Sequence, residues 1–274
     1  MISPHLSSSL ERNLRAAFAR AYVRIIGSLR EPSWILWESV LPIFTLSGYV
    51  YVYRYMETPQ EFTGFVILGG VVVAFWLNVI WSMASQLYWE KETGNLVPLL
   101  IAPISRMAIL LGMAMGGIFN TTLRALVIII VGTLVFKVSF VLTNPGLASL
   151  IFVLTLCALY LLGMTFASAF LTYGREAWHM SHLLMEPIFF LSGLYYPLRY
   201  LPYWLQLVGS AIPLTFGIDA MRQVLLQGAG LEQVKIHLIA LFLFILLFLG
   251  LATYSLRHME DLSRRDGRLT MRWQ

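Results

Sequence analysis

Long apolar runs separated by short polar segments dominate the hydrophobic pattern of this chain. An α-helix needs about 20 such residues to cross the roughly 30 Å hydrocarbon core of a bilayer. Six runs reach that length, so the pattern predicts an all-α polytopic membrane protein built as one domain over residues 1–274. The six predicted spans cover residues 34–53, 63–87, 107–136, 147–173, 178–196 and 236–256.

The composition supports the membrane class. The chain is 58% hydrophobic and 12% charged, with a mean hydropathy of +0.74, whereas a soluble domain carries about 25% charged residues. Cys157 is the single cysteine, which excludes an intrachain disulfide. The formal charge of +5 comes mostly from arginines near the two ends. In so apolar a chain it indicates a membrane surface and not a nucleic-acid partner.

The distribution of basic residues predicts the orientation. Five arginines precede the first predicted span and five follow the last, and an even number of spans puts both groups on one side. Lys91, Arg106 and Arg175 lie in loops on that same side, while the opposite side holds only five basic residues. Because cytoplasmic loops carry the excess of lysine and arginine, both termini are predicted to be cytoplasmic.

Two stretches are predicted to lie at the membrane without crossing it. In residues 8–31, apolar side chains recur every three or four positions with most arginines off that stripe, as in an amphipathic helix along the inner leaflet. It serves either as an anchor on anionic lipid or as a lever that moves with the first span. Residues 197–227 hold two apolar pieces bounded by Pro197, Pro202 and Pro213, each too short to span. They are predicted to be external re-entrant helices.

A charged segment, residues 89–106, separates the second and third predicted spans. Thr93-Gly94-Asn95 offers a helix start, and leucines then repeat at helical spacing. Pro98 and Pro103 limit that helix to about two turns. So short an amphipathic helix suits a membrane surface, where it can fit a groove on another protein.

Three ionisable residues fall within predicted spans, namely Glu38, Arg124 and Glu186. Such groups are costly in a membrane and are functional hypotheses by default. Either Arg124 pairs with one of the acids and holds helices together, or these residues line a polar substrate path between two subunits. Pro187 weakens the helix beside Glu186, which makes Glu186 the preferred path residue.

His179, His182 and Glu186 recur at i, i+3 and i+7 and therefore share one helical face. That spacing could present metal ligands or a proton relay. The sequence supplies no second histidine pair to complete a site, and His179 lies at a predicted membrane edge. No metal site is predicted.

The printed sequence lacks three motifs of nucleotide-hydrolysing and hydrolytic enzymes: G-x-x-x-x-G-K-[ST], H-E-x-x-H and G-x-S-x-G. The chain is therefore predicted not to be an enzyme by itself and to bind no cofactor. An intramembrane enzyme is disfavoured for the same reason. Transport by such a chain needs energy from an ion gradient or from a partner.

Two blocks of sequence resemble ATP-binding-cassette type-two export permeases. The first is an acid–basic–acid run followed by Gly-Asn-Leu and then Pro-x-Ser-Arg. It is carried by Glu90, Lys91, Glu92, Thr93, Gly94, Asn95, Leu96 and Arg106. The second is similar to the drug and nodulation-factor export branch. It is carried by Ser192, Gly193, Pro197, Pro202, Pro213, Asp219 and Arg222. Pro98 departs from the family pattern, in which many relatives carry a polar residue.

The resemblance implies a dimer of permeases, identical or homologous, with two cytosolic ATPase subunits that bind ATP and Mg. It places the protein in a bacterial or archaeal plasma membrane. Residues 89–106 would be the coupling helix on the ATPase, and the second block would form an external gate. The implied cargo is amphipathic, drug-like or lipid-like, with a lipid-linked glycan as the alternative. The rival of a different class is a gradient-driven transporter or channel that uses the intramembrane charges.

Overall fold

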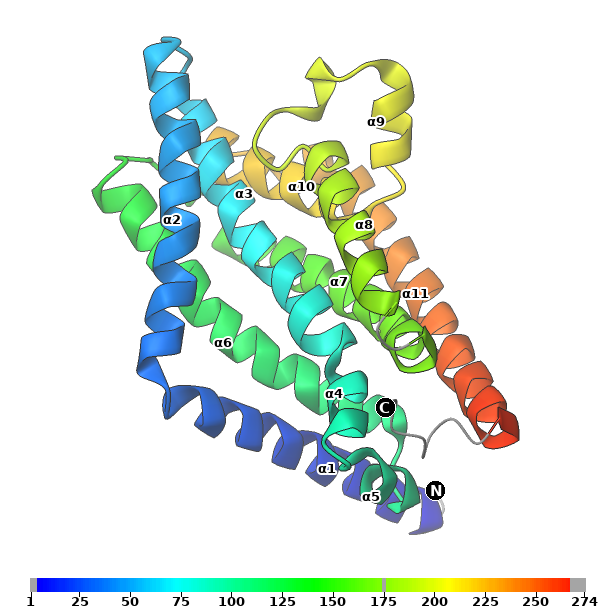
Figure 1. The fold of residues 1–274 in the computed structure, drawn as a ribbon. Helices are drawn as coiled ribbons and strands as arrows, with labels where there is room; N and C mark the ends of the chain where they lie inside the picture. Colours follow the sequence, from blue (N-terminus) through cyan, green and yellow to red (C-terminus); the bar gives the residue numbers. More distant parts are fainter. Residues whose placement is uncertain (1–3, 174–175, 267–274) are drawn as a thin grey trace.

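The computed structural model describes residues 4–173 and 176–266 (Figure 1). These residues form helices and turns without a strand, which confirms the predicted all-α class. The elements are α1 (Pro4–Leu29), α2 (Pro32–Tyr55), α3 (Glu61–Leu77), the π-helix η1 (Asn78–Ala84), α4 (Gln86–Glu92), α5 (Leu96–Ile101), α6 (Arg106–Leu134), α7 (Pro145–Tyr173), α8 (Glu176–Leu191), the 3₁₀ turn η2 (Leu198–Tyr200), α9 (Tyr203–Gly209), α10 (Pro213–Gln227) and α11 (Leu231–Asp266).

Five helical stretches in the described chain are long and apolar enough to cross a membrane, so the polytopic class is confirmed. They are Ile35–Tyr55, Glu61–Glu92, Arg106–Leu134, Pro145–Ser168 and Leu231–His258. The predicted span 178–196 is not among them. Helix α8 has 16 residues and ends at Leu191, so it is about 24 Å long and falls short of the hydrocarbon core. The six-span count remains a prediction, and Arg175, Arg268 and Arg272 of the charge argument lie outside the described residues.

The second predicted span is the centre of the bundle. It runs as one helical stretch over α3, η1 and α4, and 89% of its most apolar window is buried, against 17% for α2 and for α11. Its π-helical part begins at Asn78, whose Oδ1 accepts a hydrogen bond of 2.9 Å from the Tyr160 hydroxyl of α7. Gly117 of α6 lies so close to this oxygen that a Cβ would collide with it. A polar contact inside the apolar core therefore marks where the helix changes its winding.

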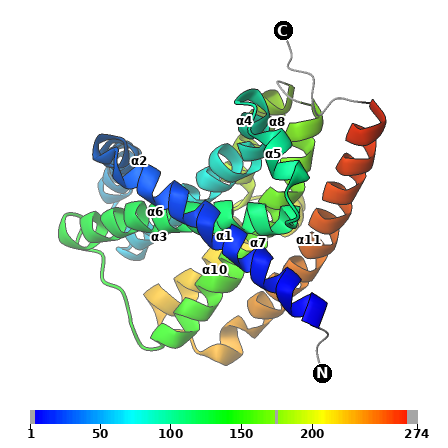
Figure 2. The ribbon, with the colours of Figure 1, turned by 90° about the horizontal axis from the view of Figure 1, so that it is seen from below.

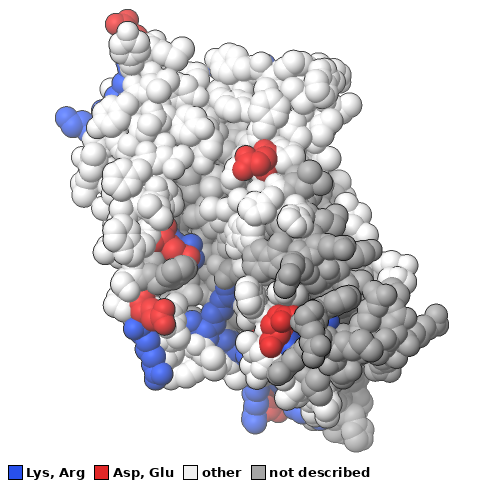
Figure 3. All heavy atoms as spheres, in the orientation of Figure 1, with Lys and Arg blue, Asp and Glu red and all other residues white. Residues whose placement is uncertain are grey.

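Helix α1 lies across the end of the bundle that also carries α4 and α5 (Figures 1 and 2). Its small residues Ala17 and Ala21 are buried, while the predicted apolar stripe faces outward, with Phe18 and Tyr22 at least 60% exposed. An interfacial helix presents such an exposed apolar stripe to lipid, and the interfacial position of α1 stays a prediction. On the face that Figure 3 shows, charged side chains gather mainly toward this same end, and most of the described surface above them is uncharged.

Close packing of α1 on α6 depends on Gly112. A Cβ at this position would meet the backbone of Ala17, and backbone cannot move aside as a flexible side chain can. We expect Gly112→Ala to cost about 1–3 kcal/mol of unfolding free energy, measured by equilibrium unfolding in lipid nanodiscs. The matched control is Gly27→Ala in α1, where a Cβ meets nothing within 4 Å and alanine favours the helix. Equal stability of the two variants would contradict this account of the crossing.

Of the two predicted re-entrant helices, only the second forms as one continuous helix. Residues 198–212 do not form one helix, because Pro202 separates the turn η2 from the short helix α9. Leu201 before it is extended, as the residue preceding a proline tends to be. Residues 214–226 do lie in one helix, α10, which packs against α3, α7 and α11. The α9 region is exposed, while α10 buries one side in the core.

Candidate functional site

The coupling segment, defined as residues 89–106, forms the end of α4, a tight turn and α5. Gly94 makes the turn with a φ of +80°, a left-handed conformation that glycine adopts without strain. Helix α5 has only six residues and is shorter than the predicted two turns. It ends because Ala102 before Pro103 is extended, with a ψ of 139°.

Three of the eight residues predicted to couple to an ATPase face inward. Glu90, Lys91 and Leu96 are each no more than 8% exposed. The Glu90 carboxylate accepts hydrogen bonds from Arg20 of α1 and, at 3.2 Å, from Gln86. In this structure these side chains pack inside the segment, and their predicted coupling role stays a prediction. The residues of the segment that are exposed, and so form its outer surface, are Trp89, Thr93, Gly94, Asn95, Pro98, Ile101, Pro103 and Ser105.

Helix α1 holds the coupling segment at both ends. Besides the Arg20–Glu90 ion pair, the Asn13 side chain accepts a hydrogen bond of 2.8 Å from the Ser105 backbone N–H. The sequence pattern assigns Arg20 to the polar face of the N-terminal arm and gives no reason to place it beside Glu90. The only signal is that positions 13 and 20 are seven apart, on one face of the helix.

The intramembrane charges separate into a pair and a single acid. Arg124 of α6 and Glu38 of α2 form an ion pair of 2.9 Å, with 17% and 33% of the side chains exposed. This contact connects α2 to α6. It corresponds to the interpretation in which Arg124 pairs with an acid and holds helices together. Glu186 is exposed on α8 and has no ion pair within the described residues. His179 and His182 are also exposed, and the described residues hold no cluster that could bind a metal.

An apolar cavity of about 290 Å³ opens between α2, α3 and α8. Its walls include Leu41, Val73 and Phe189, and Tyr195 from the turn that follows α8. Phe189 lies three residues after Glu186, so the apolar wall and the free carboxylate are on the same helix. Such walls suit the apolar part of a small amphipathic molecule.

Arg222 organises the second family-like block. Its guanidinium is 3% exposed, donates to the carbonyls of Gly193 (2.7 Å), Leu194 (2.5 Å) and Phe65 (3.0 Å), and stacks over the Phe65 ring at 4.2 Å. Burial lowers the pKa of Arg222 to about 9, so it stays charged at neutral pH. Gly193 forms the turn after α8 with a φ of +63°. Arg222 therefore fixes the end of α8 against α3 and α10.

The other residues of this block are spread around the same region. Ser192 is buried beside that turn, and Pro197 precedes η2. Pro213 starts α10, and the Asp219 carboxylate lies 2.9 Å from the ring of His237 on α11. The structure thus brings Ser192, Pro197, Asp219 and Arg222 to one cavity and leaves Gly193, Pro202 and Pro213 outside its lining. His237 is the member that the sequence pattern misses.

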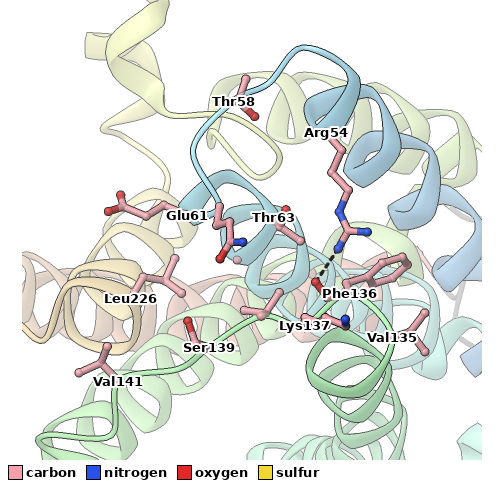
Figure 4. A pocket seen from close by; sticks show the side chains of 13 residues that line it. Arg54, Thr58, Glu61, Thr63, Val135, Phe136, Lys137, Ser139, Val141 and Leu226 are labelled. Carbon is pink, nitrogen blue, oxygen red and sulfur yellow. Dashed lines mark hydrogen bonds between the residues drawn. The ribbon is translucent and has the colours of Figure 1, made fainter.

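A second outer cavity, of about 490 Å³, lies where α2, α3 and the α6–α7 connection meet (Figure 4). Arg54 points into this region and donates a hydrogen bond of 2.6 Å to the Phe136 carbonyl. Lys137 beside it has a φ of +55°, so the chain turns sharply there. The Arg54 contact holds this connection against the end of α2.

A family model and several curated proteins are similar to this chain in sequence. A family model described as "ABC-2 type transporter" matches residues 14–226. The chain is 25% identical over 175 residues to "Probable multidrug ABC transporter permease YbhR" of Escherichia coli, which covers 64% of this chain and 47% of that one. It is 30% identical over 110 residues to "Polysialic acid transport protein KpsM" of Escherichia coli, which covers 38% of this chain and 42% of that one.

A eukaryotic protein is also similar. The chain is 25% identical over 198 residues to "ABC transporter G family member 20" of Dictyostelium discoideum, covering 71% of this chain and 26% of the relative. The chain therefore spans about half the length, or less, of these curated relatives.

Proposed function

Because this chain belongs to the ABC-2 type transporter family, we propose that it is the transmembrane subunit of an ATP-driven exporter. Family membership identifies an integral, multi-pass membrane permease that is not itself the ATPase. The observation that supports the rest is the coupling segment. It is a short helix with an exposed apolar edge at the end of the bundle where charged side chains gather (Figures 1 and 3).

Two cytosolic ATPase subunits, which bind ATP and Mg, are the proposed partners. The proposed docking surface consists of Trp89, Gly94, Asn95, Pro98 and Ile101. Ile101 is 78% exposed and Trp89 is 47% exposed, and such apolar groups next to a charged rim favour a protein partner. The proposal puts α1 on the cytoplasmic side together with this surface, and it extends to both termini and to a bacterial or archaeal plasma membrane. Glu90 and Arg20 hold this surface in place from behind.

The proposed cargo is an amphipathic, drug-like or lipid-like compound. The apolar cavity between α2, α3 and α8 and the exposed Glu186 support a path for it along a face that a second permease copy completes. The printed names of the relatives extend from multidrug to polysialic acid transport, so a lipid-linked glycan is the alternative cargo. Transport of labelled candidates into inverted vesicles that contain the ATPase decides between them. Transport without any ATPase would overturn the exporter proposal in favour of a gradient-driven transporter.

Gly94→Val and Glu92→Lys are expected to uncouple ATP hydrolysis from export while the fold stays intact. Valine at a positive φ costs about 1–3 kcal/mol and forces the turn before α5 to rearrange. Lysine at the end of α4 suits the helix dipole, so its effect falls on the charge beside the docking surface and not on the helix. The measurement is the amount exported per ATP hydrolysed in reconstituted vesicles, with an expected loss of at least tenfold.

Gly146→Val is the matched control, because a Cβ at Gly146 meets nothing within 4 Å and the residue starts α7 at the other end of the bundle. Its coupling ratio should stay at the wild-type value. Unchanged export and ATPase stimulation in both coupling-segment variants would show that this segment does not dock.

A further inference from the structure

Two cations line the cavity of about 490 Å³ where α2, α3 and the α6–α7 connection meet, at the end of the bundle opposite the coupling segment (Figures 1 and 4). Arg54 comes from the end of α2 and Lys137 from the connection, and both are exposed. Among the described lining residues the only acid is Glu61. Figure 4 shows its carboxylate pointing away from both cations. The lining thus carries two positive charges and one negative charge, with the positive ones on one side.

The backbone at Lys137 is in a conformation that lysine avoids. Its φ of +55° lies in the left-handed region, which glycine adopts freely and other residues adopt at a cost. Two hydrogen bonds hold the connection just after it. Val138 N–H donates to the Gly132 carbonyl at 3.0 Å, and Val141 N–H donates to the Leu225 carbonyl at 2.7 Å. Strained residues of this kind gather at functional sites, so the position of this ammonium calls for a functional explanation.

Both cations have N–H donors that a ligand can use. The Arg54 guanidinium has five of them, and its hydrogen bond of 2.6 Å to the Phe136 carbonyl holds the group in place. The Lys137 ammonium forms no hydrogen bond or ion pair within the part of the chain that the structure describes. Gln60 and Ser139 add an amide and a hydroxyl to the same lining. Two cations that share a cavity repel each other, and an anion between them is attracted by both.

A phosphodiester has the chemistry that this lining recognises. The planar guanidinium of arginine matches two phosphate oxygens, and the ammonium of lysine binds phosphate as a point charge. The single negative charge of a phosphodiester equals the net charge of the lining. A zwitterionic choline headgroup adds a cation of its own, which Arg54 and Lys137 would repel. The lining therefore favours an anionic phosphodiester.

The depth of the cavity indicates a lipid as the source of that group. Arg54 lies in the last turn of the apolar stretch Ile35–Tyr55, and Lys137 follows soon after the stretch Arg106–Leu134 ends. Both cations therefore lie at the level where a bilayer has its phosphate groups. Just before Lys137, the side chains of Leu134 and Val135 are more than half exposed. An acyl chain below a bound headgroup would cover them, whereas a soluble phosphodiester would not.

We propose that this cavity, defined by Arg54, Gln60, Lys137 and Ser139, binds the phosphate of an anionic phospholipid as a fixed structural lipid. The bound phosphate connects the end of α2 to the α6–α7 connection and offsets the repulsion between the two cations. This lipid is not the cargo, and the site needs neither an ATPase nor transport. A soluble phosphodiester presents the same group without acyl chains, so the experiment compares the two sources.

The test uses the purified full-length chain in a non-ionic polyoxyethylene detergent, with native mass spectrometry to count bound molecules and obtain their dissociation constants. The probes are phosphatidylglycerol, phosphatidylcholine and soluble glycerophosphoglycerol. We expect phosphatidylglycerol to bind at least tenfold more tightly than phosphatidylcholine. Weaker binding of glycerophosphoglycerol than of phosphatidylglycerol identifies a lipid site, and equal or tighter binding identifies a site for soluble phosphodiesters.

Lys137→Gly separates binding from folding, because it removes the cation and relieves the left-handed backbone at once. The ligand-free unfolding midpoint should stay the same or rise, while the affinity for phosphatidylglycerol falls about tenfold with the loss of a charge-assisted hydrogen bond. Arg54→Gln should lower the affinity by a similar factor. The matched control is Arg199→Gln, an exposed arginine at the same end of the bundle that does not line this cavity. Its affinity should stay within about twofold of wild type.

Two results would overturn the proposal. One is that phosphatidylglycerol binds the wild-type chain no more tightly than phosphatidylcholine while glycerophosphoglycerol does not bind. The other is that Lys137→Gly keeps the wild-type affinity or loses no more of it than Arg199→Gln does. That second result would mean that the lipid responds to surface charge in general, including the arginines of α1, and not to this cavity.

Discussion

Replacing Arg222 with alanine is expected to lower the unfolding free energy by at least about 3 kcal/mol, because three carbonyl acceptors lose their donor at once. The hydrogen bonds to Gly193 and Leu194 are buried, and the one to Phe65 is partly buried. The turn after α8 would separate from α3 and α10. Equilibrium unfolding in nanodiscs and the yield of folded protein are the measurements.

Arg222→Lys should lie between wild type and alanine, since an ammonium keeps the charge but lacks the planar fork of donors. Arg199→Ala is the matched control, because Arg199 is exposed on the same connection and a surface substitution changes stability by less than about 0.5 kcal/mol. If Arg222→Ala is as stable as Arg199→Ala, the buried guanidinium does not hold this region together.

Reversing the charge of Glu90 is expected to reduce export per ATP at least tenfold. Glu90→Arg places two cations together, with Arg20 facing it, and α1 loses its contact with the end of α4. A hydrogen-bonded ion pair contributes about 1.5–3 kcal/mol, enough to displace the coupling segment from its position. The coupling ratio in vesicles with the ATPase measures this loss.

The exchange variant Arg20→Glu with Glu90→Arg restores opposite charges and should recover most of the coupling ratio. Glu11→Gln is the matched control, since Glu11 forms an exposed ion pair with Arg15 within α1 and lies outside the coupling segment. Failure of the exchange variant to recover, with Glu11→Gln at the wild-type ratio, would mean that the negative charge of Glu90 itself touches the ATPase. In that case Glu90 would act by contacting the ATPase and not by holding the coupling segment against α1.

Most of the fold follows from the sequence because membrane helices must satisfy their own backbone hydrogen bonds, so long apolar runs have one outcome. The predicted span 178–196 is an exception, because the helix ends at Leu191. The predicted span continues through residues 192–196, yet Gly193 turns the chain and Arg222, distant in sequence, holds the turn. Hydropathy does not record such a contact.

The candidate site was less predictable. Residues 89–106 are visible as a charged interruption, but periodicity over a few residues does not tell which side packs against α1. Glu90 therefore looks like a docking residue in the sequence and is an internal one in the structure. Arg124 had two possible acids, and only the arrangement of α2 beside α6 selects Glu38. His237 could not be linked to Asp219 from sequence, because no spacing rule joins α10 to α11.

The enclosed position of the central helix has a mechanical consequence. Helix α3 and the π-helical η1 are surrounded by packed side chains, and protein interiors are dense and poorly compressible. This helix cannot slide past its neighbours without opening voids along its length. We therefore expect a displacement of α4 and α5 to tilt α3 together with the helices packed on it. The surfaces that would then move against their surroundings are the outward faces of α2 and α11, whose most apolar windows are only 17% buried.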